Sequence, residues 1–214
     1  DPASLDLDLD ETFTDCSGLR IGQYQIARLI GRGGMGAVYE AVQDAPRRSV
    51  ALKLMNTGLA SRQAVRRFKD EAAVLGKLRH PSIAQVYEAG IYQPPAPGAA
   101  SVPYFAMEYV PDALPITLAA TARKLSLRER VTLCVQICDA VQHGHQRGVI
   151  HRDLKPENIL LTRREPTLPV VALLADFGLA RDVDQSLMYS RVGTLNYLSP
   201  EVAQGCPYTM KTDI

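Results

Sequence analysis

A glycine cluster between two β-like stretches constrains the fold more than any other feature of this sequence. GRGGMGAV carries glycines at positions 31, 33 and 36, follows YQIARLI and continues directly into AVYEAV. Dinucleotide-binding folds use similar spacing, but there the third glycine opens a helix inside a βαβ unit. Here a second strand follows, so we predict a hairpin whose glycines let backbone N–H groups approach phosphate oxygens. A glycine-rich turn without a ligand is the alternative.

Composition limits the classes of protein that remain. The 214 residues are 46% hydrophobic and 22% charged, which is typical of one large globular domain or two small lobes. A formal net charge of +1 creates no overall field that would attract nucleic acid or an anionic membrane. No apolar run is long enough to span a bilayer and no signal peptide opens the chain, so we expect a cytoplasmic protein. Because the first residue is Asp1 rather than Met, we expect a part of something longer.

Cysteine and histidine spacing gives little support for a metal site. The four cysteines contain no C-x-x-C pair, so we expect reduced thiols in the core of a cytosolic domain. His143 and His145 are two residues apart, which places them on different faces of a helix. No second pair of ligands lies nearby in the sequence, so we expect no metal there.

The first half of the chain predicts a sheet with one helix. Residues 1–19 form an acidic leader or linker, with a docking strand built from Leu5, Leu7 and Leu9 as the alternative. Short β-like stretches follow in residues 20–107 and predict an antiparallel meander. Residues 61–80 are the exception, because apolar residues recur there at helical spacing before Pro81. The apolar positions of this predicted helix are Val65, Phe68, Ala72 and Leu75.

The second half of the chain predicts mainly helix. Ser126 and Glu129 form a capping box at the start of a helix over residues 125–148, which Gly148 ends. Two short strands follow, around residues 158–161 and 170–175. The fold class is therefore α+β: a lobe over residues 20–107, a hinge at 108–110 and a mainly helical lobe over 111–214. We predict that the buried stripe of the long helix consists of Leu127, Val131, Cys134 and Cys138.

A lysine on an apolar strand requires a partner. Lys53 lies in VALK, and an unpaired buried ammonium group is costly. Glu71, which shares the helix face of Phe68 and Leu75, can supply the opposite charge. The alternative for Lys53 and Glu71 is a surface side chain whose stem covers the core.

The stretch HRDLKPENIL concentrates opposed charges in one loop. These residues could form structural salt links, but Asn158 and Asp176 each lie beside a predicted buried strand. Two oxygen donors at the ends of adjacent strands suit magnesium, which usually shares its ligands with substrate phosphates. This hypothesis leaves Asp153 available for chemistry.

Taken together, these motifs resemble the signature set of the protein kinases. GRGGMGAV resembles the glycine-rich loop, VALK the strand lysine, HRDLKPEN the catalytic loop, DFG the metal-binding turn, and SPE a variant of A-P-E. All occur in the order of the family, from about Tyr24 to the last residue. The residues of these motifs are similar to those of the bacterial, eukaryotic-like serine/threonine protein kinases. The excess of arginine over lysine in the chain, 18 to 6, is also similar to that branch of the family. The resemblance implies a bilobal kinase fold that uses ATP and Mg²⁺ and acts on protein substrates.

The resemblance also implies roles for individual residues. Asp153 would orient the acceptor hydroxyl and accept its proton late, while Lys155 would stabilise the transferring phosphoryl group. Lys155 and Thr194 together are typical of serine/threonine rather than tyrosine kinases, and His151 and Phe177 would only pack. Asn158 and Asp176 would bind magnesium. The implied nucleotide-binding residues are Ile30, Gly31, Gly33, Gly34, Gly36, Val38, Ala51, Lys53, Met107, Glu108, Val110, Leu160 and Asp176; core packing is the alternative for the apolar ones.

Regulation and competing functions follow from the same motifs. Arg152 would pair with a phosphate on the activation segment, where Ser186, Tyr189 and Ser190 are the candidate sites and Arg181 could assist. Ordinary loop hydroxyls are the alternative. A pseudokinase or scaffold is the competing class, but Lys53, Asp153 and Asp176 are all present. GTLNYLSPE disfavours a small-molecule kinase, because it resembles a segment that receives a peptide.

The end of the sequence carries a further expectation. By resemblance, TDI opens a long buried helix and Asp213 is the aspartate at its start. We therefore expect residues 1–214 alone not to be a competent kinase. More chain, a partner or self-association would cover an apolar face that includes Leu127, Val131 and Cys138.

Overall fold

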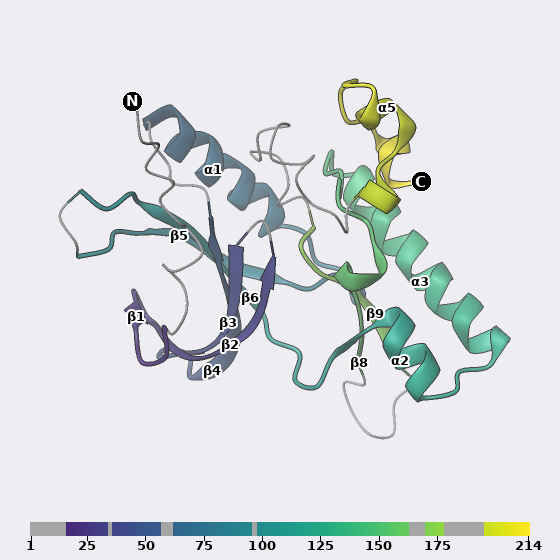
Figure 1. The fold of residues 1–214 in the computed structure, drawn as a ribbon, viewed down its shortest axis with the longest axis horizontal. Coiled ribbons are helices and arrows are strands. Elements are labelled where there is room, and N and C mark those ends of the chain that lie inside the picture. The colour runs from purple at the N-terminus through teal and green to yellow at the C-terminus, as the bar shows by residue number, and fades with distance from the viewer. Residues whose placement is uncertain (1–15, 34–35, 57–61, 96–97, 163–169, 178–194) are drawn as a thin grey trace, which may run out of the picture. The chain divides into compact units, whose positions relative to one another are not determined.

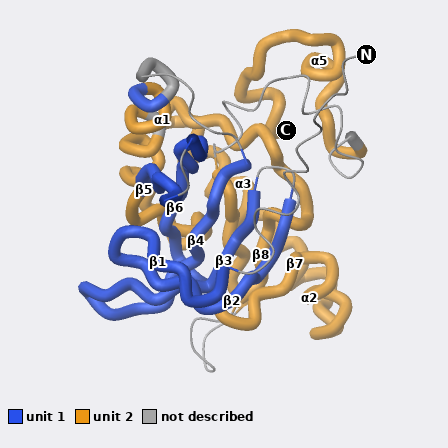
Figure 2. Tube along the Cα trace, turned by 60° about the vertical axis from the view of Figure 1, so that its left-hand side comes forward, with its two compact units in different colours: residues 1–66, 89–109 blue, residues 67–88, 110–214 orange. Residues whose placement is uncertain are grey.

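The computed structural model describes residues 16–33, 36–56, 62–95, 98–162, 170–177 and 195–214. The chain forms two compact units, shown in different colours in Figure 2. The first, the sheet unit, comprises residues 1–66 and 89–109. The second, the helical unit, comprises residues 67–88 and 110–214.

The sheet unit contains a strongly bent antiparallel meander (Figure 1). Its strands are β1 (Arg20–Ile21), β2 (Tyr24–Gly33), β3 (Gly36–Gln43), β4 (Arg48–Met55), β5 (Val86–Tyr92) and β6 (Val102–Glu108), arranged in the order β1-β2-β3-β4-β6-β5. β5 extends across the boundary between the units. The predicted antiparallel meander is therefore confirmed, and β2, β3 and β4 overlap the stretches YQIARLI, AVYEAV and VALK of the sequence analysis.

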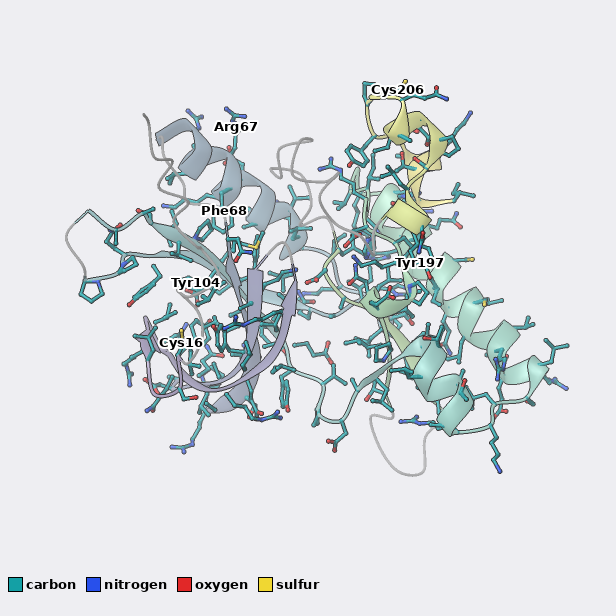
Figure 3. All side chains as sticks on the ribbon, viewed as in Figure 1. Cys16, Arg67, Phe68, Tyr104, Tyr197 and Cys206 are labelled. Carbon is teal, nitrogen blue, oxygen red and sulfur yellow. The ribbon has the colours of Figure 1, made fainter. Side chains whose placement is uncertain are left out.

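One face of this sheet carries the core of the unit. Tyr39, Leu52 and Ala106 occupy paired positions on β3, β4 and β6, and all three are buried. Side chains alternate between the two faces of a strand, so Val38 and Lys53, paired with each other, lie on the opposite face. The rings of Tyr24 and Tyr104 meet edge to face on the core side, with centroids 6.1 Å apart. Figure 3 labels Tyr104 among these strands.

Helix α1 (Arg62–Leu75) is the predicted helix of the first half. Phe68 and Leu75, two of its expected core residues, are buried, whereas Val65 and Ala72 are half-buried. Figure 3 shows Arg67 and Phe68 leaving the helix in different directions, and Arg67 is exposed. The amphipathic pattern therefore identified the helix correctly.

The helical unit packs helices against a small sheet. Strands β7 (Leu114–Pro115), β8 (Ile159–Thr162) and β9 (Val171–Leu174) pair antiparallel in that order. The helices are α2 (Ile116–Ala122), α3 (Leu127–His145) and α5 (Pro200–Ala203), with 3₁₀ turns η1 (Pro156–Asn158), η2 (Leu195–Tyr197) and η3 (Met210–Asp213). Leu133 of α3 packs on this sheet in a core cluster with Ala119, Ile159, Leu161 and Ala172.

The start of α3 agrees with the sequence, but its predicted buried stripe is wrong. Ser126 and Glu129 form the expected capping box. The buried residues of the helix are Leu133, Ala140, Val141 and Gly144, while the expected stripe is exposed, with Leu127 at 78% and Val131 at 54%. Two apolar stripes run along this helix, and periodicity alone does not tell which one the sheet β8–β9 covers.

The prediction of core thiols is also wrong. All four cysteines are free, as expected, but Cys134, Cys138 and Cys206 are exposed and Cys16 is half-buried. Figure 3 shows the sulfur of Cys206 at the edge of the helical unit. The error for Cys134 and Cys138 has the same cause as the stripe, because both lie on the uncovered face of α3. None of the helices in the described part of the chain is long and apolar enough to cross a membrane.

Candidate active site

The glycine hairpin of the sheet unit closes between β2 and β3. Gly31 pairs with Val38, and Gly33 pairs with Gly36 at the tip. Gly36 has φ +145°, and a Cβ at this position would overlap the backbone carbonyl oxygen of Leu54. By contrast, a Cβ at Gly31 or Gly33 would meet no atom within 4 Å. Among the three hairpin glycines that the structure describes, the backbone conformation requires glycine only at position 36, whereas Gly31 and Gly33 leave open space beside the main chain.

Lys53 is buried in the sheet unit, as the sequence predicted. Its exposed fraction is 3%, and it lies between Val38 of β3 and Phe105 of β6 on the face away from the core cluster. The pairing with Glu71 stays a prediction, because the side chain of Glu71 lies outside the described residues.

Other proposed nucleotide-binding residues differ in burial. Ala51 and Met107 are paired across β4 and β6, and both are buried. Ile30 is 43% exposed, and Val38 is half-buried. In the sheet unit, this set combines apolar side chains on one face with the open backbone of the hairpin.

The end of β6 is connected to β2 through a tyrosine. The guanidinium of Arg28 donates a 2.9 Å hydrogen bond to the hydroxyl of Tyr109 and lies 2.8 Å from the carboxylate of Glu40. Burial, followed by hydrogen bonding to Glu40, raises the pKa of Tyr109. Glu108 and Val110, the two expected hinge residues, are half-buried on either side of this tyrosine.

In the helical unit, the loop of residues 151–158 begins at a fully buried histidine. The Nδ1 atom of His151 accepts a hydrogen bond from the N–H of Asp153, so Nε2 carries the proton that is donated to the carbonyl of Ala175, 3.0 Å away. Burial lowers the pKa of His151, which keeps it neutral. Its ring lies 5.0 Å from that of Phe177. His151 and Phe177 are therefore packing residues, in agreement with the sequence analysis.

Asp213 fixes the backbone of the same loop. Its carboxylate accepts hydrogen bonds from the N–H groups of His151, at 2.7 Å, and Arg152, at 2.8 Å. It also lies 2.8 Å from the Nε2 atom of His145 at the end of α3. Arg152 has φ +70°, a conformation that costs about 1–3 kcal/mol for a residue with a side chain and that these bonds hold in place.

Asp153 is buried and held by its neighbours. Only 7% of this residue is exposed, and its Oδ2 atom lies 2.9 Å from the Nζ atom of Lys155. The amide of Asn158 donates two hydrogen bonds to Asp153, at 2.7 Å to the carbonyl and 3.0 Å to Oδ2. The structure therefore places together the three residues that the sequence assigned to the loop.

Asn158 and Asp176 lie at the ends of paired strands. Ile159 pairs with Leu174, and the N–H of Ala175 donates a 2.8 Å hydrogen bond to the carbonyl of Asn158. Because the amide nitrogen of Asn158 points to Asp153, its side-chain oxygen remains for a cation. Asp176 adopts φ +59° two residues after the end of β9. An amide oxygen and a carboxylate suit Mg²⁺ bound to phosphate, and no cluster of three His, Cys, Asp or Glu residues offers a fuller cage in the described part of the chain.

Several predicted residues lie outside the described part of the chain. They are Gly34, Arg181, Ser186, Tyr189, Ser190 and Thr194. Leu160, on β8 of the helical unit, is half-buried. The role of His145 as a partner of Asp213 was missed, because two residues 68 positions apart give no local signal.

Comparison with known proteins identifies the family. Residues 24–214 match the protein kinase domain. The chain belongs to the protein kinase family. The match begins at the first residue of β2 and includes both units, so the resemblance inferred from the motifs is confirmed.

The relatives of this kinase-family chain are bacterial. It is 34% identical over 201 residues to a probable serine/threonine-protein kinase PknB of Bifidobacterium longum, which covers 90% of the chain and 28% of that protein. It is 37% identical over 198 residues to serine/threonine-protein kinase PknA of Mycobacterium tuberculosis, which covers 90% of the chain and 44% of that protein. The chain thus spans less than half the length of these curated relatives.

A solved structure confirms the fold class. The crystal structure of the Mycobacterium tuberculosis PknI kinase domain matches with a TM-score of 0.67 and 29% sequence identity, over 92% of this chain and 71% of that chain. The fold is therefore the kinase-like α+β fold that the motifs predicted.

Proposed function

We propose that the protein transfers the γ-phosphoryl group of ATP to serine and threonine hydroxyls of other proteins. The buried carboxylate of Asp153, fixed by Lys155 and Asn158 on a clamped loop, is the observation that carries this proposal. An aspartate held in this way is suited to orienting a hydroxyl group. Family membership, the bacterial serine/threonine kinase relatives and the presence of Lys53 and Asp176 add support.

In this mechanism Asp153 acts as the proton acceptor. A carboxylate with an ordinary pKa near 4 is too weak to ionise a free hydroxyl, but it can align the hydroxyl and take its proton late in the reaction. Lys155 lies beside this carboxylate and supplies positive charge near the developing negative charge. His151 takes no proton, because its ring nitrogens are both engaged and burial lowers its pKa.

By resemblance to the family, each unit has residues with a role in binding the nucleotide or the metal. Gly31, Gly33 and Gly34 would offer backbone N–H groups to phosphates, and Lys53 would bind them by charge. Asn158 and Asp176 would hold Mg²⁺, which neutralises charge on the phosphates when bound. Ile30, Val38, Ala51 and Leu160 would form the apolar surroundings of the adenine ring, with Met107, Glu108 and Val110 beside it.

Regulation by phosphorylation is part of the proposal. Arg152 is placed rigidly through its backbone bond to Asp213, and its guanidinium carbon lies 5.5 Å from the centroid of the Tyr208 ring. A phosphate on Ser186, Tyr189, Ser190 or Thr194 would offer this guanidinium a stronger, charged partner than an aromatic ring. We therefore expect autophosphorylation within residues 186–194 to raise activity.

A pseudokinase or scaffold remains the alternative function. It would bind nucleotide or partners without transfer, but such proteins usually lack one of the residues corresponding to Lys53, Asp153 and Asp176. The proposal also includes a cytoplasmic location, which four unpaired thiols suit.

Phosphoamino acid analysis tests the proposal directly. The full-length protein is incubated with radiolabelled ATP, Mg²⁺ and a generic basic protein, and the labelled residues of the acceptor are identified. We expect phosphoserine and phosphothreonine, and no label from a matched Asp176→Asn protein. Absence of both autophosphorylation and transfer to the acceptor, in a wild-type protein that still binds ATP, would favour the scaffold.

A further inference from the structure

A cavity lies along one flank of α3 in the helical unit, next to the end of the β8–β9 connection. Its volume is about 330 Å³, within the usual range of ligand-binding pockets. The lining residues are Leu125, Arg128, Glu129, Thr132, Leu133, Gln136 and Val170. Three of them, Leu125, Leu133 and Val170, belong to or pack on the core cluster below, so the floor of the cavity is aliphatic.

The cavity is separate from the exposed apolar face of α3. Three residues of α3 that line the cavity are at positions 128, 132 and 136. Each is the next residue in the sequence after an exposed apolar residue of the helix, at positions 127, 131 and 135. One residue corresponds to a rotation of about 100° around a helix. A partner that covers the exposed apolar stripe therefore leaves the cavity on another side of the helix.

The polar walls of the cavity are already fixed, with one exception. The side chain of Gln136 accepts a 3.0 Å hydrogen bond from the N–H of Ala172, which ties α3 to β9. The carboxylate of Glu129 accepts bonds from the N–H and hydroxyl groups of Ser126, and these bonds lower its pKa. The guanidinium of Arg128 makes no hydrogen bond or ion pair with any residue that the structure describes. Arg128 is thus the group that a ligand would meet.

The sequence beside this end of the cavity is rich in positive charge, and Arg128 is the cation that lines the cavity. Residues 123–130 contain four cationic side chains and one carboxylate, and that carboxylate is occupied by the helix cap. The cations are Arg123, Lys124, Arg128 and Arg130, all on exposed residues. An aliphatic floor beside the guanidinium of Arg128 favours a ligand that combines aliphatic side chains with a carboxylate.

The cavity lies far from the candidate site of phosphoryl transfer. Arg128 and His145 are separated by 17 helical residues, or about 25 Å along the axis of α3. His145, not Arg128, contacts the aspartate that clamps the loop of residues 151–158. A ligand of the cavity would therefore not compete with groups at Asp153.

We propose that this cavity is a docking site for an extended segment of a partner protein in which aliphatic and acidic residues alternate. The aliphatic side chains would enter the cavity over Leu125, Leu133 and Val170, and a carboxylate between them would pair with Arg128. This docking function goes beyond the proposed transfer reaction, and its test does not depend on activity.

A peptide with this pattern occurs in the chain itself. Residues 4–11 read SLDLDLDE, with leucines at alternate positions separated by aspartates. A fluorescent copy of this octapeptide is the probe. The protein used is the full chain carrying Leu5→Ser, Leu7→Ser and Leu9→Ser, so that its own copy of the pattern does not compete.

Fluorescence anisotropy measures the affinity of the probe for two matched variants. Arg128→Glu reverses the charge at the cavity, and Arg79→Glu makes the same change at an exposed residue of the same unit outside it. We expect Arg128→Glu to weaken binding at least about tenfold and Arg79→Glu to have little effect. A probe with serine in place of its three leucines should not bind, and hydrogen exchange should show protection of residues 125–136. Equal affinity for both variants, no binding of the leucine probe, or protection confined to other residues would overturn the proposal.

Discussion

The loop of residues 151–158 and the glycine hairpin of residues 31–36 are held in opposite ways. In the loop, polar side chains are fixed by partners distant in sequence, since Asp213 holds the backbone and Asn158 holds Asp153. In the hairpin, Gly31 and Gly33 have no neighbouring atom where a Cβ would be, and only Gly36 meets the backbone of Leu54.

This difference matches what each region is proposed to do. A group that accepts a proton must be held in one geometry, and buried hydrogen bonds provide this. A segment that covers phosphates contributes backbone N–H groups and needs space rather than side-chain bonds. We therefore expect changes in the loop to affect the rate and stability strongly, and changes in the hairpin to depend on the individual glycine.

The largest effect should distinguish the proposed metal ligand of the helical unit, Asp176, from Lys53 of the sheet unit. We expect Asp176→Asn to lower kcat about a thousandfold and to raise the Mg²⁺ concentration needed for half-maximal rate, because a carboxylate ligand is lost. Lys53→Met should lower kcat/KM for ATP about a hundredfold without changing the Mg²⁺ requirement as much. Titrations of ATP and Mg²⁺ measure both. An identical response of the two variants would contradict the separate roles.

The next largest effect should come from Asp213, whose carboxylate holds the backbone of the loop of residues 151–158. Asp213→Ala leaves the buried N–H group of His151 and the partly buried N–H group of Arg152 without their acceptor, so we expect the free energy of unfolding to fall by about 3 kcal/mol. Asp213→Asn keeps one acceptor oxygen and should lose less. Urea unfolding followed by circular dichroism measures both. If the alanine variant is as stable as wild type, the loop is held by other contacts.

A smaller effect should distinguish two glycines of the hairpin. Gly36→Ala places a Cβ against the carbonyl of Leu54 at φ +145°, and we expect a loss of about 2 kcal/mol in stability. Gly31→Ala serves as the control, because its Cβ meets no atom within 4 Å. Thermal unfolding of the two variants compares them. Equal losses would show that the strain at Gly36 does not limit stability.

The smallest effect is a dependence on pH. Burial lowers the pKa of His151 below its ordinary value of 6.5, so the unfolded chain binds more protons than the folded chain just below that pH. The contribution of His151 to the free energy of unfolding should therefore be fully present above about pH 6.5. It should decrease on acidification toward the folded pKa, by at most about 1.4 kcal/mol per pH unit. His151→Phe should reduce this slope. An unchanged slope of unfolding free energy against pH in that variant would exclude His151 as its source.

Local patterns predicted much of the fold and of the loop. The capping box at Ser126 and the apolar strand around Lys53 were identified correctly, because each depends on residues close together in sequence. The grouping of Asp153 with Asn158 was also accessible, since both lie within one short loop. The ordered motifs then identified the family.

What the sequence could not predict depends on distant contacts. Leu127 and Leu133 both fit an apolar stripe, and only the position of the sheet β8–β9 decides that Leu133 is buried. The bond between His145 and Asp213 joins residues that are 68 positions apart in the sequence, and no local sequence pattern indicates it. Helix α2 was missed because its seven residues, ITLAATA, are too few for a clear helical period.

The central claim is that Asp153 accepts the proton of the protein hydroxyl and does not bind the nucleotide. The direct test measures phosphoryl transfer and ATP affinity side by side for the full-length wild-type protein and Asp153→Asn. We predict that transfer falls about a thousandfold while the Kd for ATP stays within about twofold, since asparagine keeps the shape but cannot take the proton. Near-normal transfer by Asp153→Asn would contradict the account, as would a loss of transfer explained entirely by weaker ATP binding.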